Sequence, residues 1–257
     1  MDGIERPWNL LVPMKKPELV LLRWAVVGTV LLCGCRKGTR EEERMRPSSY
    51  DFAPFKAGLY SATKTYFRGV ERDVDERVYC FVLYTSGEMS SFFPLFMTEE
   101  GLDRVCAEYR QHSLYAGDTD EEIHEYLRYN PEDSSHYLQC LDSSEDLFAD
   151  VNRIGGQMAA VLQSIDTGHG WQEFEDFAAK TEDAIVDVLK RLSDEGVFGT
   201  GDERNKIFVS MMMGDQDDSV LRLGRRINRP AARADFERNW AWLGEQAEAQ
   251  STESGLP

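Results

Sequence analysis

Two short apolar runs joined by a tight turn constrain the fold most strongly. Val78–Thr85 is rich in β-branched and aromatic residues without clean polar alternation, which is typical of a strand covered on both faces. Phe92–Met97 follows a turn that begins at Ser86, so the two strands are expected to pair antiparallel. Because Pro94 has no backbone N–H to donate, the second strand should lie at a sheet edge or carry a bulge.

Helical patterns occupy most of the remaining chain. Apolar residues recur at three- and four-residue steps over residues 50–70, which predicts an amphipathic helix. Thr98 is placed to cap the helix after the second strand, with Glu99 and Glu100 in its first turn. Further helices are predicted from Asp142 or Ser143 to about Leu162, from Trp171 to Gly196, over Ser219–Ile227, and from Pro230 through Leu243.

A third strand is predicted over Lys206–Met213, whereas Ile123–Tyr129 fits either a short strand or a helical turn. Helices therefore separate the strands in an irregular order. We expect an α+β fold in which helices pack on a small, largely antiparallel sheet of three to five strands.

Composition divides the chain into three parts. Residues 1–46 form a leader, and residues 47–244 have the length and apolar content of a single globular domain. Residues 245–257 form a polar tail that is expected to be disordered.

The leader supports three interpretations. Basic residues precede an apolar stretch that ends in Leu32-Cys33-Gly34-Cys35, which resembles a lipoprotein cleavage site and would make Cys35 the anchor of a membrane-bound protein. Alternatively, the glutamate codons just before Met45 spell a purine tract like a ribosome-binding site, so that translation starts at Met45 and the protein is cytoplasmic. The third interpretation is a plain disordered extension.

Charge limits the classes of partner. The 257 residues carry a formal charge of −17, and residues 45–257 alone hold 40 acidic and 21 basic side chains, a charge of −19. Nucleic acids and anionic lipids are polyanions, so they are not expected as partners, and a membrane would be reached only through a lipid on Cys35. An acidic surface suits a basic protein partner.

The cysteines and histidines do not suggest a metal site. Cys80 and Cys106 lie on apolar stretches and are expected to be buried thiols, and Cys140 has no neighbouring cysteine with which to form a Cys-x-x-Cys pair. No pair of cysteines or histidines has the spacing of zinc ligands. The four histidines fall in polar loops or on polar helix faces: His112, His124, His136 and His169.

Enzyme signatures are missing from the sequence. It contains no Gly-x-Ser-x-Gly elbow, Walker loop or His-Glu-x-x-His pair, so we expect no cofactor and assign no catalytic residue. Several charged residues are nevertheless predicted near strand ends and could form a polar binding cleft: Glu99, Arg128, Asp133, Asp215, Asp217 and Arg226. Ion pairs that fix loops onto the sheet are the simpler interpretation of the same residues. A tryptophan exposed beside acidic residues, either Trp240 or Trp242, would favour a partner surface.

Three blocks give the chain its resemblance to a known family. They are the strand pair with Thr98-Glu99-Glu100-Gly101-Leu102, the stretch Leu127–Asp133, and the third strand with its acidic turn and Arg226-Ile227-Asn228. In this order, over residues 50–242, they resemble domain of unknown function number 4303. Ser134 stands where that family tends to have tryptophan. The resemblance implies a bacterial, mostly cytoplasmic protein without an established activity, and small acidic bacterial families of this sort include immunity proteins.

Two functional hypotheses follow. The first is a non-enzymatic domain that binds a basic protein partner as an immunity or regulatory factor. The second is a hydrolase or small-molecule-binding domain that uses Arg128, Asp133 and Asp215 in one cleft, which requires these side chains to converge.

Overall fold

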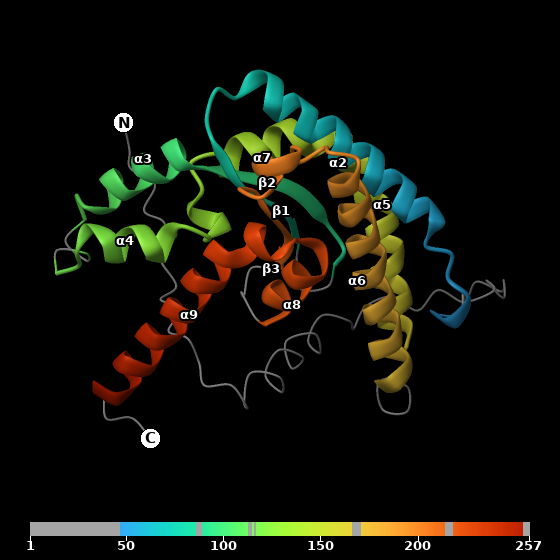
Figure 1. Cartoon of the computed structure of the whole chain (residues 1–257). Helices are drawn as coiled ribbons and strands as arrows, with labels where there is room; N and C mark the ends of the chain where they lie inside the picture. Colours follow the sequence, from blue (N-terminus) through green and yellow to red (C-terminus); the bar gives the residue numbers. More distant parts are fainter. Residues whose placement is uncertain are drawn as a thin grey trace, which may run out of the picture. The chain divides into compact units, whose positions relative to one another are not determined.

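The computed structural model describes residues 47–85, 89–112, 115, 117–165, 171–213 and 218–253 (Figure 1). Residues Met45–Trp242 form one compact unit, which contains the sheet and its helices. The second unit takes in Met1–Arg44 and Leu243–Pro257, of which the structure describes only the last turns of the C-terminal helix.

The described elements follow each other in the order η2 (Pro47–Ser49), α2 (Ala53–Asp73), β1 (Val78–Thr85), β2 (Phe92–Thr98), α3 (Glu99–Tyr109), α4 (Asp120–Leu127), η4 (Pro131–Asp133), α5 (Tyr137–Ser164), α6 (Trp171–Asp194), α7 (Gly201–Arg204), β3 (Phe208–Met213), α8 (Asp218–Ile227) and α9 (Pro230–Glu253). This is an α+β fold, as the sequence predicts.

The sheet is mixed, which corrects the prediction of a largely antiparallel one. Its three described strands lie in the order β2-β1-β3, with β1 antiparallel to β2 and parallel to β3. The connection between β1 and β2 is short in sequence, so β2 reverses direction, but β3 follows a connection of several helices that brings the chain back to the end of the sheet where β1 begins. The direction of β3 therefore depends on helix packing that no local pattern records.

Both edges of this sheet are covered by side chains. Pro94 lies in the edge strand β2, as expected, and on this strand the Phe92 N–H donates to Asn152 Oδ1 at 2.7 Å while Phe96 O accepts from Ser134 Oγ at 3.1 Å. On β3, the side chain of Asn228 binds the N–H and C=O of Val209. Polar side chains thus occupy edge groups that would otherwise pair with another strand.

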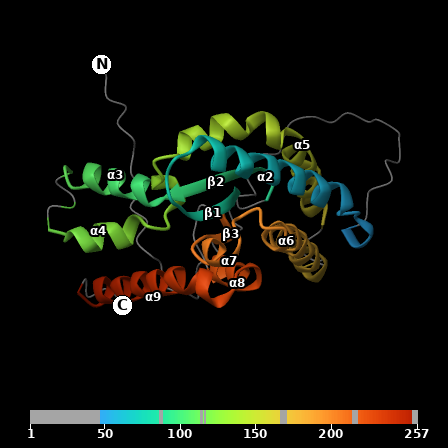
Figure 2. The ribbon, with the colours of Figure 1, turned by 45° about the horizontal axis from the view of Figure 1, so that its top comes forward.

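The helices enclose the sheet, with α2 on one side and α8 on the other in both views (Figure 1, Figure 2). Every residue of β1 after Val78 is buried, which confirms the prediction of a strand covered on both faces. Phe67 of α2 packs edge-on against Phe81, and Phe208 of β3 stacks on Phe236 of α9. Cys80, Cys106 and Cys140 are buried, and no disulfide joins them to a described residue.

Two helix boundaries differ from the sequence pattern, and one segment that the pattern left open is a helix. Residues 120–127 are a helix, because Thr119 and Glu122 form a reciprocal capping box at its start. The helix expected from Asp142 or Ser143 begins earlier, at Tyr137. The last helix reaches Glu253, beyond the start of the tail for which composition predicts disorder. Across the described segments, none of the helices is both long enough and apolar enough to cross a bilayer.

Candidate functional site

Charged side chains gather where β2 passes into α3. Thr98 is the last residue of β2 and the N-cap of α3, and its Oγ1 accepts from the N–H of Gly101 at 3.0 Å. Antiparallel pairing sets Val78 opposite Thr98, so the residues just before β1 lie beside the start of α3. Glu76 is therefore brought to the same corner of the sheet as Glu99, which explains why the cluster forms here.

Arg128 is the most constrained cation of this corner. Its two terminal nitrogens donate to the two oxygens of Glu99 at 3.0 and 2.9 Å, and its Nε donates to Asp235 Oδ2 at 2.7 Å. Its guanidinium carbon lies 4.6 Å from the ring centre of Tyr79. Burial opposes the charge, but the hydrogen bonds to Glu99 and Asp235 outweigh it and raise the pKa of Arg128. The side chain is thus a permanently charged tie between α3, the turn after α4 and α9.

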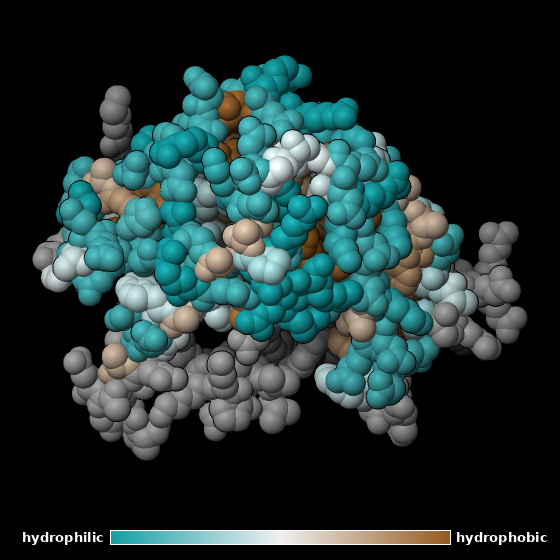
Figure 3. Space-filling model, in the orientation of Figure 1, coloured by the Kyte–Doolittle hydropathy of each residue, from teal (hydrophilic) through white to brown (hydrophobic). Residues whose placement is uncertain are grey.

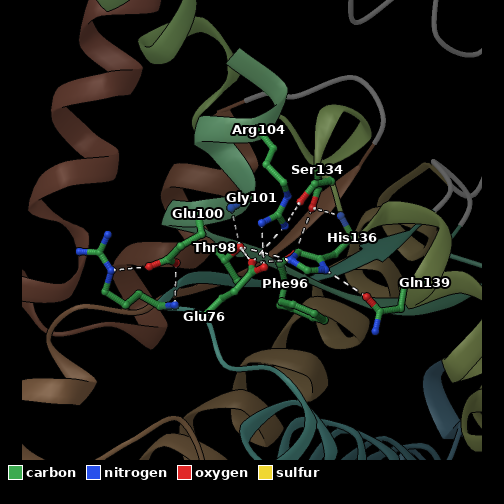
Figure 4. Close-up of polar contacts among 11 residues, drawn as sticks. Glu76, Phe96, Thr98, Glu100, Gly101, Arg104, Ser134, His136 and Gln139 are labelled. Atoms are coloured by element: carbon green, nitrogen blue, oxygen red, sulfur yellow. Dashed lines mark hydrogen bonds and ion pairs between the residues drawn. The ribbon is translucent and has the colours of Figure 1, made fainter. Parts of the chain in front are cut away.

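Glu76 forms the second group, shown in Figure 4. Arg104 binds it with two terminal nitrogens at 2.8 and 3.2 Å, and Thr98 Oγ1 donates to Glu76 Oε2 at 2.5 Å. His136 Nε2 lies 3.0 Å from the same oxygen, while its Nδ1 lies 3.1 Å from Gln139 Oε1. The hydrogen bonds from Arg104 are the largest of the causes that lower the pKa of Glu76 from 4.5 to about 2.

The chemistry of this group favours a structural role. A carboxylate with a pKa of about 2 is a weak proton acceptor near neutral pH, so Glu76 is poorly suited to general-base catalysis. The hydroxyl of Thr98 is also occupied, because it caps α3 and donates to Glu76. The side chain of His136 is buried and packs on Phe96, with ring centres 4.5 Å apart. These contacts join the loop before β1 to α3 and to the start of α5.

The lowered pKa of Glu76 predicts a pH dependence of stability. The folded pKa lies below the ordinary value, so the ionised carboxylate stabilises the fold above the unfolded-state pKa, and this contribution is lost as the pH falls. Allowing for solvent screening, we expect about 1–2 kcal/mol to be lost between roughly pH 5 and pH 2. Unfolding free energies of the wild type and Glu76→Gln, measured across this range, should converge toward the acid end. A difference that stays constant with pH would refute the assignment, and Glu145→Gln, an exposed change on α5, is the control.

The other described residues predicted for a cleft have partners of their own. Asp133 Oδ1 accepts from the Tyr109 hydroxyl and Oδ2 from Asn130 Nδ2, both at 2.5 Å. Arg226 lies on the exposed side of α8, where it donates to Asp183 of α6 at 2.7 Å. Among the described members of the predicted set, only Glu99 and Arg128 bond to each other, while Asp133 and Arg226 have different partners.

Three predicted positions lie outside the described residues: Asp215, Asp217 and Cys35. Within the segments that the structure describes, no three histidine, cysteine or acidic side chains lie close enough together to hold a metal ion.

A shallow pocket of about 370 Å³ lies elsewhere, between the first turns of α4 and the middle of α9. Its lining comprises Thr119, Glu121, Glu122, Glu125, Arg238 and Trp242. Trp240 and Trp242 are both half-buried, and Trp240 stacks on Phe236. Trp242 is therefore the tryptophan that lies beside acidic residues.

Sequence patterns miss four of the residues that organise these sites. Glu76 and Asp235 lie in charged segments, and nothing local shows that they reach Thr98 or Arg128. His136 was expected on a polar segment, but it is buried. Asn228 is visible only as part of the family-like Arg-Ile-Asn stretch, where its position just after a predicted helix is the only local signal.

Asn228 connects three elements. Its amide nitrogen donates to Val209 O at 2.7 Å and Gly224 O at 2.9 Å. Its carbonyl oxygen accepts from the Val209 N–H at 3.0 Å and from Arg204 Nη2 at 2.8 Å. The buried side chain therefore fastens the end of α8 to β3, and it meets part of the hydrogen-bonding demand of the buried Arg204 guanidinium.

The chain belongs to the family described as a domain of unknown function (DUF4303), which it matches over residues 59–229. The match begins within α2 and ends just beyond α8, so it contains the whole sheet and Asn228. No curated protein and no solved structure matches the chain. The family thus agrees with the resemblance found in the sequence, and it carries no assigned activity.

Proposed function

We propose that this protein is a non-enzymatic binding domain, of the immunity or regulatory kind, that engages a basic protein partner. The partner surface is the acidic hairpin, defined as residues Glu99–Leu127, which comprises α3, α4 and their connection. The charge of this segment is the observation that carries the proposal.

The acidic hairpin concentrates negative charge in a short stretch. It holds nine acidic side chains and two arginines, a formal charge of −7 over 29 residues. The helices α3 and α4 lie side by side away from the strands (Figure 1), and hydrophilic residues dominate the face shown in Figure 3. Four exposed carboxylates of the hairpin have no ion pair with a described residue: Asp103, Glu108, Asp118 and Glu121. Such a surface attracts cationic proteins and speeds their encounter.

An aromatic side chain accompanies these charges. Tyr126 of α4 is 46% exposed, and it lies one helical turn from Glu122 on the same helix. Tyrosine supplies large contact area at low conformational cost and is enriched among the residues that dominate binding energy. Charge would thus set the association rate, and Tyr126 would contribute affinity.

The alternative of a hydrolase or small-molecule site at Arg128, Asp133 and Asp215 has less support. The guanidinium of Arg128 already binds two carboxylates, and Asp133 bonds to Tyr109 and Asn130. These pairs fit the loop-fixing interpretation better than an open reactive cleft.

Neutralising the hairpin should slow association with the partner. The test variant is Asp103→Asn/Glu108→Gln/Asp118→Asn, which leaves every residue of the α4–α9 pocket unchanged. After the partner is recovered from the native cells and produced pure, its on-rate is expected to fall about 3- to 10-fold at low salt, with a nearly unchanged off-rate. The measurement is biolayer interferometry at several salt concentrations.

The matched control removes three exposed carboxylates outside the hairpin that also have no ion pair with a described residue, as Glu145→Gln/Asp146→Asn/Glu173→Gln. An equal effect of both variants would attribute binding to net charge and would contradict a hairpin surface. The proposal would also be refuted if the on-rate of the hairpin variant kept the full salt dependence of the wild type. A partner that is itself acidic would refute it as well.

The start at Met45, with a cytoplasmic location, stays a prediction. Mass spectrometry of the N-terminal peptide tests it directly. A mature terminus at a lipid-modified Cys35 would contradict it and would support the membrane-anchored alternative.

A further inference from the structure

The pocket between α4 and α9 has an excess of negative charge. Glu121, Glu122 and Glu125 come from α4, and Arg238 is its single cation. Arg238 binds Asp235 of its own helix and lies 3.9 Å from Glu125. Three carboxylates therefore face one guanidinium that already has a carboxylate partner.

These three carboxylates differ in how many hydrogen bonds and ion pairs they already form. Glu121 is exposed and has no ion pair with a described residue. Glu122 uses Oε2 to accept from the N–H and hydroxyl of Thr119. Glu125 uses Oε2 to accept from Asn239 Nδ2 at 2.9 Å. Acceptor capacity is left on all three, since an ionised carboxylate has about four lone-pair positions.

Two further observations distinguish this place from an ordinary acidic surface. The pocket is a half-open hollow of about 370 Å³, and half-buried Trp242 forms part of its wall. Asn239, which donates to Glu125 but does not itself line the pocket, has a buried Oδ1 with no hydrogen-bond donor among the described residues. An indole face beside carboxylates is the combination that binds organic cations, because the ring attracts the cation and the carboxylates accept its hydrogen bonds.

We propose that this pocket receives an arginine side chain of the basic partner. Arginine fits better than lysine, because its planar guanidinium stacks on an aromatic ring while its N–H groups bind carboxylates in a fork. The inference rests on the proposed function and deepens it: the acidic hairpin steers the partner, and the Trp242 pocket anchors one residue of it. Anchors of this kind act mainly on the off-rate.

The test titrates the full chain with a small probe, N-acetyl-arginine methylamide, and follows the protein by NMR. The salt concentration is about 0.15 M, because exposed charges farther apart than the Debye length of about 8 Å are then largely screened. We expect saturable shifts of the Trp242 indole N–H and of the Glu121 and Glu125 amides. The citrulline analogue, which has the same shape without charge, should produce none. Glu121→Gln should weaken the probe several-fold, whereas the Trp240 indole signal, which reports an intact fold, should not change.

Two controls separate this inference from the proposed function. The hairpin variant Asp103→Asn/Glu108→Gln/Asp118→Asn should bind the probe like the wild type, while it associates slowly with the partner. If citrulline shifts the signals equally, or if Trp242→Leu leaves the Glu121 and Glu125 shifts intact, the arginine pocket is refuted even though the hairpin surface stands. With the partner itself, Trp242→Leu should raise the off-rate and leave the on-rate unchanged; an unchanged off-rate would also refute the pocket.

Discussion

Replacing Arg128 with methionine is expected to lower the free energy of unfolding by about 3–5 kcal/mol. Methionine retains much of the apolar stem, but it leaves the carboxylates of Glu99 and Asp235 without their shared cation in a partly buried site. It also removes the cation–π contact with Tyr79. Chemical denaturation followed by circular dichroism measures the loss.

The matched control is Arg72→Met. Arg72 pairs with Asp73 in an exposed position at the end of α2, so its loss should cost less than about 1 kcal/mol. The double variant Arg128→Met/Glu99→Gln should recover part of the stability, because it removes one of the two orphaned charges. Equal losses of unfolding free energy for Arg128→Met and Arg72→Met would show that the stability of the fold does not depend on the ion pairs of Arg128 with Glu99 and Asp235.

Replacing Asn228 with alanine should cost about 3–4 kcal/mol. The change removes four hydrogen bonds and leaves the N–H and C=O of Val209 and one Arg204 nitrogen without these partners in the interior. Each buried group that loses its only partner costs about 1–3 kcal/mol. Unfolding experiments in urea measure this difference at constant m-value.

Asn228→Asp is the informative companion variant. Aspartate keeps the acceptor oxygens and supplies a counter-charge for Arg204, but it cannot donate to Val209 O and Gly224 O. We expect a loss intermediate between wild type and Asn228→Ala. The exposed Gln172→Ala on α6 serves as the control with little effect. A cost below about 1 kcal/mol for Asn228→Ala would contradict the role of this side chain as a fastening between β3 and α8.

The parts of the fold that depend on near neighbours can be predicted from the sequence. The short connection after β1 requires β2 to be antiparallel, and Thr98 caps α3 by its own hydroxyl. Thr119 and Glu122 also have the sequence spacing of a capping box. This spacing favours a helix over a strand for residues 120–127. The direction of β3 depends on how the intervening helices pack, so periodicity alone could not give it.

The contacts of the candidate site depend on packing between distant segments, so the sequence pattern could not predict them. The pairing of Glu99 with Arg128 joins residues 29 apart, and that of Arg128 with Asp235 joins residues 107 apart. Neither has a spacing that a helix or hairpin would impose. Loop-fixing ion pairs were the simpler interpretation of these charges, and the contacts of Arg128 fit it. Trp242 meets the acidic residues of α4 only because α9 passes beside that helix.

Site-specific photo-crosslinking in lysates of the native cells tests the acidic hairpin most directly. A photoreactive amino acid at the exposed position Glu108 should capture one discrete protein of basic charge, and capture should fall sharply when salt is raised before irradiation of the lysate. The same group at Glu145 of α5 should not capture it. If Glu108 captured no discrete basic protein, or if both positions captured the same one equally, the acidic hairpin would not be the partner surface.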